Sequence, residues 1–181
     1  MLVVFTGNGK GKTTAALGQA ARTVGRDRKV LMIQFIKGPW KSGEDFIAIA
    51  KRDGTPEEKA KAEFKLVKKG LGFVGILGDR LPREDHARAA REALQYFREE
   101  LARGVWDLVI LDEVNVAVSL GLISEAEVLQ AVALVPDAKF VILTGRGAPQ
   151  SFIDRADMVT EMREVKHPFS DGKMAKIAIE F

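Results

Sequence analysis

Short apolar segments alternate with amphipathic segments along this chain. Four apolar runs have the length and composition of buried strands: Leu2–Thr6, Val30–Ile36, Leu108–Leu111 and Phe140–Leu143. Weaker strand patterns lie at Met158–Glu161 and Ala175–Phe181. The runs LVIL and FVIL are continuously apolar, which is typical of strands that helices cover on both faces of a parallel sheet.

Helical periodicity fills the intervals between these strands. The predicted helices are Thr13–Val24, which stops at Gly25, Glu84–Arg103, which stops at Gly104, and one that opens at the capping box Ser124–Glu127 and runs to Pro136. This alternation predicts an α/β fold with a mostly parallel sheet and helices on both faces. We expect a single domain over residues 1–181.

The segment from Pro39 to Pro82 lacks this regularity. We expect long loops and one short helix there, forming a flexible insertion over the active site. Within it, Lys51–Lys69 holds seven basic and four acidic residues, an excess of three that equals the net charge of the whole chain. Mixed charge of this kind favours a solvated flap, with a basic surface that steers an anionic ligand as the alternative.

Composition removes several classes of protein. The chain has no cysteine, which excludes disulfides, thiolate catalysis and cysteine-ligated zinc, and is consistent with a reducing cytoplasm. Only two histidines are present, so a multi-histidine metal site is not expected. No apolar run reaches the roughly 18 residues of a membrane span. Because the basic excess lies in one segment, a nucleic-acid partner is not expected either.

The stretch TGNGKGKTT, Thr6–Thr14, lies between the first predicted strand and the first predicted helix. Backbone N–H groups and the positive end of a helix there face an anion. Lys12 would add a charge to phosphates, and the Thr13 hydroxyl would reach magnesium. The spacing between its outer glycines is one residue shorter than the standard motif. A tight turn gives no reason for the lysines and threonines, so we predict a phosphate-loop, RecA-like nucleotide-binding domain.

Two further turns follow predicted strands at the same edge of the sheet. Asp112 and Glu113 end the buried run VILDE, where carboxylate oxygens suit magnesium. An ordinary acidic loop is the alternative. Arg146 follows the strand FVILT and would pair with phosphate or lie in a surface salt bridge.

The aromatic and histidine residues have simpler readings. Trp40, in QFIKGPWKSGE, suits a flat ligand, with ordinary packing as the alternative. Trp106 precedes a strand and is expected in the core. His86 opens an amphipathic helix and is expected to face solvent, while His167, in VKHPF, is expected to be structural.

Taken together, the motifs resemble one family, the ATP:corrinoid adenosyltransferases of the phosphate-loop type. They occur in the family's order: TGNGKGKTTAALG, QFIKGPWKSGE, LDE, TGRGAP, IDRADMVTEM and VKHPF. The resemblance covers nearly the whole chain except roughly Asp45–Leu71, and the short loop GNGKGKT is the family's own form. It implies transfer of the 5′-deoxyadenosyl group of ATP to the cobalt of a Co(I) corrinoid with release of triphosphate, in cobalamin synthesis or salvage.

The resemblance also assigns residues and partners. It implies ATP binding by Gly7, Asn8, Gly9, Lys10, Gly11, Lys12, Thr13, Thr14 and Arg146. Lys12 and Glu113 would be catalytic, Thr13, Asp112 and Glu113 would hold magnesium, and Trp40 and Phe73 would face the corrinoid. Gln34, Lys37 and Glu44 belong to the matched loop. The family implies a homodimer and a flavoprotein reductant.

Two departures separate this chain from the family pattern. The family usually reads Gly-Phe-Thr-Trp in the loop that closes on the corrinoid, and this chain reads Gly72-Phe73-Val74-Gly75. The family's aromatic groups lie against the lower face of the corrin and help to displace its axial ligand, so Gly75 bears on Co(II) reduction. The C-terminal segment Ala175–Glu180 also differs. A small-molecule kinase or NTPase and a non-catalytic corrinoid- or ATP-binding module are the alternatives.

Overall fold

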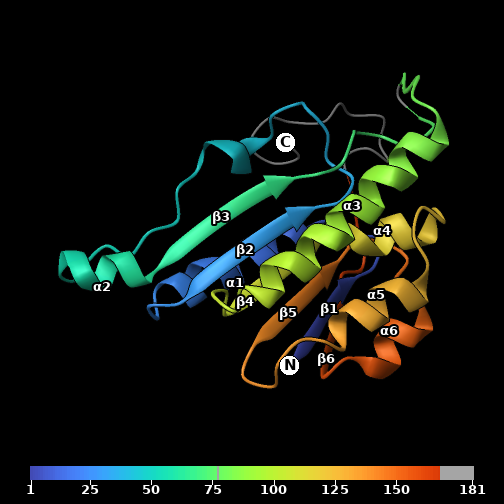
Figure 1. Cartoon of the computed structure of the whole chain (residues 1–181). Coiled ribbons are helices and arrows are strands. Elements are labelled where there is room, and N and C mark those ends of the chain that lie inside the picture. The colour runs from blue at the N-terminus through green and yellow to red at the C-terminus, as the bar shows by residue number, and fades with distance from the viewer. Residues whose placement is uncertain (77, 168–181) are drawn as a thin grey trace.

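The computed structural model describes residues 1–76 and 78–167, and in this part of the chain the strands form one parallel sheet (Figure 1). Its order is β3-β2-β4-β5-β1-β6. The strands are β1 (Leu2–Thr6), β2 (Lys29–Gln34), β3 (Glu63–Lys68), β4 (Leu108–Asp112), β5 (Phe140–Thr144) and β6 (Met158–Glu161). The predicted α/β fold is confirmed, whereas the predicted strand Ala175–Phe181 lies outside the described residues.

Helices cover both faces of this sheet (Figure 1). The described helices are α1 (Lys12–Val24), α2 (Pro56–Lys61), α3 (Arg83–Ala102), α4 (Val114–Ser119), α5 (Glu125–Val132) and α6 (Gln150–Arg155), with a 3₁₀ turn η1 (Gly43–Phe46). Helix α1 packs on one face, and α3, α4, α5 and α6 contribute to the core on the other. None of the described helices is long and apolar enough to cross a membrane.

The central strands are apolar on both sides because each side meets a helical layer. In β2, Leu31 and Ile33 join the cluster on the α3 side, while Val30 and Met32 join the cluster on the α1 side. All four are 0% exposed, which accounts for a run without the alternation of a half-exposed strand. The capping box predicted at Ser124–Glu127 is also present at the start of α5.

Strand β3 corrects the prediction that residues 39–82 hold only loops and one short helix. It pairs with β2 along its whole length, from Lys29↔Glu63 to Gln34↔Lys68. The charged residues of β3 led to the wrong prediction, because an edge strand tolerates lysines that a central strand does not. Its apolar side chains Phe64 and Leu66 pack beside the α1 layer.

The structure agrees with the prediction for Trp106 and disagrees with the prediction for His86. Trp106 is 6% exposed, as expected for core, and its Nε1–H donates to Glu100 at 2.6 Å. The prediction that His86 faces solvent is wrong, because this side chain is 3% exposed. Its Nε2 lies 3.0 Å from a carboxylate oxygen of Asp79, which comes from the loop that precedes α3.

Candidate active site

The phosphate loop connects β1 to α1, and different structural constraints require glycine at its different glycine positions. Gly7 and Gly11 have φ values of 94° and 116°, a region that favours glycine over residues with a side chain. At Gly9 a Cβ atom would lie 2.7 Å from the backbone of Arg163. The Gly9 N–H donates to the Met162 carbonyl at 2.6 Å, so the chain after β6 packs directly on this loop.

Lys12 is buried inside the curve of the loop. Its Nζ donates to the carbonyl oxygens of Gly7 at 2.8 Å and Gly9 at 2.6 Å. Burial lowers the pKa of Lys12 and the charge of Arg146 lowers it further, while Glu113 opposes both. The Lys12 side chain thus lies at the centre of the loop, and the predicted neighbours Asn8, Lys10 and Thr14 are exposed around it.

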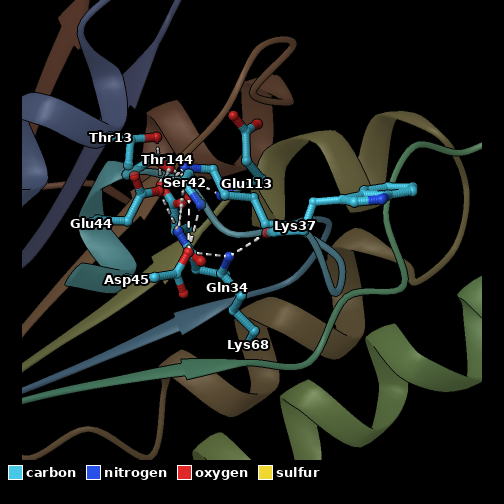
Figure 2. Close-up of polar contacts among 11 residues, drawn as sticks. Thr13, Gln34, Lys37, Ser42, Glu44, Asp45, Lys68, Glu113 and Thr144 are labelled. Carbon is cyan, nitrogen blue, oxygen red and sulfur yellow. Dashed lines mark hydrogen bonds and ion pairs between the residues drawn. The ribbon is translucent and has the colours of Figure 1, made fainter. Parts of the chain in front are cut away.

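Asp112 is the residue that ties the phosphate loop to the sheet edge. It is 0% exposed, and its Oδ1 accepts hydrogen bonds from the hydroxyls of Thr13 at 2.9 Å and Thr144 at 2.7 Å. Its Oδ2 accepts from Gln34 Nε2 at 3.0 Å. The ends of β2, β4 and β5 and the start of α1 thus converge on one carboxylate, as Figure 2 shows for Thr13, Thr144 and Gln34.

Glu113 has a different role from its neighbour. Its φ is 61°, a left-handed conformation that is uncommon outside glycine, and its N–H donates to Thr144 Oγ1 at 3.0 Å. This backbone turn directs the carboxylate away from the cluster around Gln34 (Figure 2). Burial, and next the charge of Asp112, raise the pKa of Glu113 to about 7. The two carboxylates at the end of β4 therefore differ in their hydrogen-bond partners.

The loop after β2 folds back onto Asp112 through Lys37 and Glu44. Glu44 Oε1 accepts hydrogen bonds from Gln34 Nε2 at 3.1 Å and from Lys37. Lys37 Nζ also lies 4.0 Å from Asp112 Oδ2. Burial alone would raise the pKa of Glu44, but the hydrogen bond from Lys37 and the other donors lower it to about 2. Glu44 is therefore a permanent anion that fixes this loop against the site.

Lys68, the last residue of β3, holds the same loop from the other side and escaped prediction. Its ammonium donates to the Trp40 carbonyl at 2.9 Å. It also donates to the Asp45 carboxylate (Figure 2). Asp45 also accepts the Ser42 N–H at 2.7 Å, closing the start of η1. Only the register of β3 places Lys68 beside Asp45, so no local pattern in the sequence signals this contact.

The structure brings together the two residues predicted to face the corrinoid. Trp40 is 64% exposed and Phe73 is 47% exposed, with their ring centroids 6.2 Å apart. Close packing of glycines makes this possible, because a Cβ atom on Gly72 would lie 2.5 Å from the Trp40 ring and one on Gly38 would lie 2.5 Å from Gly72 N. Trp40 is not core, and the pair forms an exposed apolar surface.

Arg146 lies at the end of β5, on the exposed side of the site. Its charge lowers the pKa of both Lys12 and Glu113. Within residues 1–76 and 78–167 it makes no ion pair, which speaks against the surface salt-bridge reading.

Comparison with known proteins is decisive for the family. The family model described as "ATP:corrinoid adenosyltransferase BtuR/CobO/CobP" matches residues 1–181. This chain belongs to that family. The corrinoid adenosyltransferase of Escherichia coli (strain K12) is 39% identical over 100% of this chain and 85% of its own length.

Two other relatives agree with this family assignment. The corrinoid adenosyltransferase CobA of Salmonella typhimurium is 37% identical over 100% of this chain and 85% of its own length. The corrinoid adenosyltransferase of Pseudomonas aeruginosa is 39% identical, over 100% and 83% respectively. Among solved structures, the hydrogenase maturation factor HypB from Archaeoglobus fulgidus aligns over 85% of this chain and 86% of its own, but a TM-score of 0.25 and 15% identity give that likeness no weight.

Proposed function

We propose that this protein transfers the 5′-deoxyadenosyl group of ATP to the cobalt of a Co(I) corrinoid. One observation carries the proposal beyond family membership. The phosphate loop follows β1, its two adjoining carboxylates lie at the end of β4, and the exposed aromatic residues Trp40 and Phe73 follow β2 and β3. All of them therefore lie at the same edge of one parallel sheet. This edge is where ligands bind in open α/β sheets. A triphosphate and a flat macrocycle would thus lie side by side.

The reaction asks little covalent chemistry of the protein. Co(I) supplies the electron pair of the new Co–C5′ bond, and the C5′–O bond breaks with its pair leaving on triphosphate. Lys12 and Arg146 would neutralise charge that grows on the leaving group. Because Co(I) is itself the nucleophile, no general base is needed, and positioning C5′ against cobalt is the protein's main task.

The residues predicted for ATP take their proposed roles from the loop geometry. We propose that the backbone of residues 7–11, the Lys12 ammonium and the hydroxyls of Thr13 and Thr14 bind the triphosphate. Thr13, Asp112 and Glu113 offer the oxygen donors that magnesium prefers and would hold this ion. When bound, magnesium would neutralise part of the triphosphate charge. Asp112 accepts a hydrogen bond from Thr13, so the contribution of Asp112 would be to orient the Thr13 hydroxyl toward the ion.

Further proposals follow from the family and from the surface of the chain. We propose that residues 39–82 lie over the active site within one domain of 181 residues. The corrinoid would rest on Trp40 and Phe73. Their rings are exposed and do not belong to the core, and an exposed aromatic surface suits a flat ligand. We also propose a homodimer, a flavoprotein that reduces Co(II) to Co(I), and a cytoplasmic location.

An anaerobic assay tests this function. The protein is mixed with MgATP and chemically reduced cobalamin, and the visible spectrum is followed for adenosylcobalamin. We expect conversion by the wild-type protein and conversion slowed by about 100- to 1,000-fold in Lys12→Ala. A phosphate-releasing kinase or NTPase would instead hydrolyse ATP without the spectral change, and a binding module would do neither. Either result would reject the proposal.

A further inference from the structure

After Phe73, the backbone N–H groups of Gly75 and Leu81 converge on a single carboxylate, that of Asp79. Its Oδ2 accepts the Gly75 N–H at 2.8 Å, and its Oδ1 accepts the Leu81 N–H at 3.0 Å. The same Oδ2 lies 3.0 Å from His86 Nε2 in the first turn of α3. The side chains of Asp79 and His86 are 8% and 3% exposed. One buried carboxylate thus closes the turn and ties it to α3.

The turn closed by Asp79 fixes the backbone on the C-terminal side of Phe73. Gly72 packs against Gly38 and the Trp40 ring, and Val74 packs against the core. The next residue, Gly75, has a φ of 69° and gives its N–H to Asp79. Phe73 itself is exposed, so its direction depends on these flanking attachments. Loss of the Asp79 contact would free the downstream side.

Gly75 occupies the position where the family resemblance places a tryptophan. A residue with a side chain is disfavoured at its φ of 69°. The hydrogen bond to Asp79 holds the backbone in this conformation. The chain therefore has a fixed turn where the family carries a second aromatic wedge, and the remaining aromatic surface is the pair Trp40 and Phe73.

We infer that Asp79 and His86 are positioning residues for the corrinoid: together they hold Phe73 against Trp40, and they do not act on ATP. The inference rests on the proposed function for its link to catalysis. Among the described residues, no contact joins Asp79 or His86 to the phosphate loop, Asp112 or Glu113. The corrinoid and nucleotide dependences of the reaction should therefore respond separately.

The first test removes the carboxylate. We expect Asp79→Ala to raise the KM for cob(I)alamin by about tenfold, the factor associated with losing one charge-assisted hydrogen bond, and to leave the KM for ATP within about twofold. Asp85→Ala is the matched control, because Asp85 is a nearby acidic residue in the first turn of α3 that pairs with the exposed Arg88. Thermal unfolding identifies any general loss of structure.

The second test acts from the histidine. His86→Gln keeps a side-chain N–H that can donate to Asp79, whereas His86→Leu has similar bulk and no donor. We expect His86→Gln to retain a KM for cob(I)alamin near that of wild type and His86→Leu to follow Asp79→Ala. Equal behaviour of the two variants would reject the hydrogen bond as the cause. An unchanged corrinoid KM in both Asp79→Ala and His86→Leu overturns the inference.

A third measurement does not need turnover. The chain has two tryptophans, so Trp106→Phe leaves Trp40 as the sole fluorescent indole. In this background we expect Asp79→Ala to increase acrylamide quenching of Trp40, because Phe73 no longer shields it, while Asp85→Ala changes nothing. If wild type makes no adenosylcobalamin, the proposed function is wrong. The quenching of Trp40 then tests by itself whether Asp79 positions Phe73. Unchanged quenching in Asp79→Ala rejects it, as does increased quenching with an unchanged corrinoid KM in an active enzyme.

Discussion

The nucleotide side and the corrinoid side of the proposed site are built in different ways. On the nucleotide side, a continuous loop of glycines, Lys12 and Thr13 meets a carboxylate, Asp112, that is 0% exposed. On the corrinoid side, Trp40 and Phe73 are exposed and are held by contacts of their neighbours, through Lys68 and Asp79. The first region is rigid because its own groups bond one another. The second depends on anchors that lie outside the ligand surface.

Removal of the buried ammonium should give the largest effect and confine it to the nucleotide side. We expect Lys12→Ala to reduce kcat/KM by about 100- to 1,000-fold, the range found when one preorganised group at a developing charge is removed. Lys10→Ala, which removes an exposed lysine of the same loop, should cost much less. Steady-state kinetics with ATP varied checks this, and equal losses in both variants would contradict a special role for Lys12.

Asp112→Asn should damage both activity and stability, since it exchanges an acceptor of three hydrogen bonds for a group with one acceptor oxygen. We expect the free energy of unfolding to fall by about 2 kcal/mol, with one buried donor left unpaired. Activity should fall by about 100-fold because Thr13 loses its orientation. Urea unfolding and kinetics measure the two effects. A fully stable but inactive variant would show that Asp112 serves only the ligand.

Substitution in the aromatic pair, Trp40 and Phe73, should change the KM for the corrinoid and not the KM for ATP. Phe73→Ala should raise the KM for cob(I)alamin by about tenfold, which corresponds to the loss of one large apolar contact, and leave the KM for ATP unchanged. Phe46→Ala serves as control, since Phe46 is 72% exposed but lies outside the pair. A rise in the KM for ATP would show that the two regions are not separable.

Glu113→Gln should stabilise the ligand-free protein at high pH. The pKa of Glu113 is raised to about 7 in the fold, so the proton bound there contributes stability below its ordinary pKa. That contribution is lost as pH rises through 7, because a buried charge then forms. We expect the variant to exceed wild type by about 2 kcal/mol at pH 8 and by little at pH 5. Urea unfolding at both values, with the exposed Glu92→Gln as control, checks the sign.

Gly75→Trp should give the smallest change. Among the described residues, no atom beyond the two chain neighbours lies within 4 Å of a Cβ atom at this position, so the first atom of a side chain meets open space. The φ of 69° makes the substitution unfavourable by about 1 kcal/mol. We expect a slightly lower midpoint of thermal unfolding, because the backbone conformation at this position is the main cost. A loss larger than that of Asp112→Asn would mean that the turn cannot accept a side chain.

The same contrast explains what the sequence could predict. The phosphate loop, Asp112 and Glu113 were predictable because strand, turn and helix follow one another within a few residues and parallel strands end at one edge. Lys68 was not, because it reaches Asp45 through the pairing of β3, whose lysines resembled a solvated segment. His86 was wrongly placed in solvent because its burial depends on the loop that carries Asp79.

The central claim is that the short phosphate loop holds a triphosphate that departs whole. The direct measurement is ³¹P NMR of the products formed anaerobically from MgATP and cob(I)alamin, with adenosylcobalamin quantified in the same sample. The account predicts inorganic triphosphate in equal amount to adenosylcobalamin and no ADP. Formation of ADP and phosphate, or adenosylcobalamin without matching triphosphate, would contradict it.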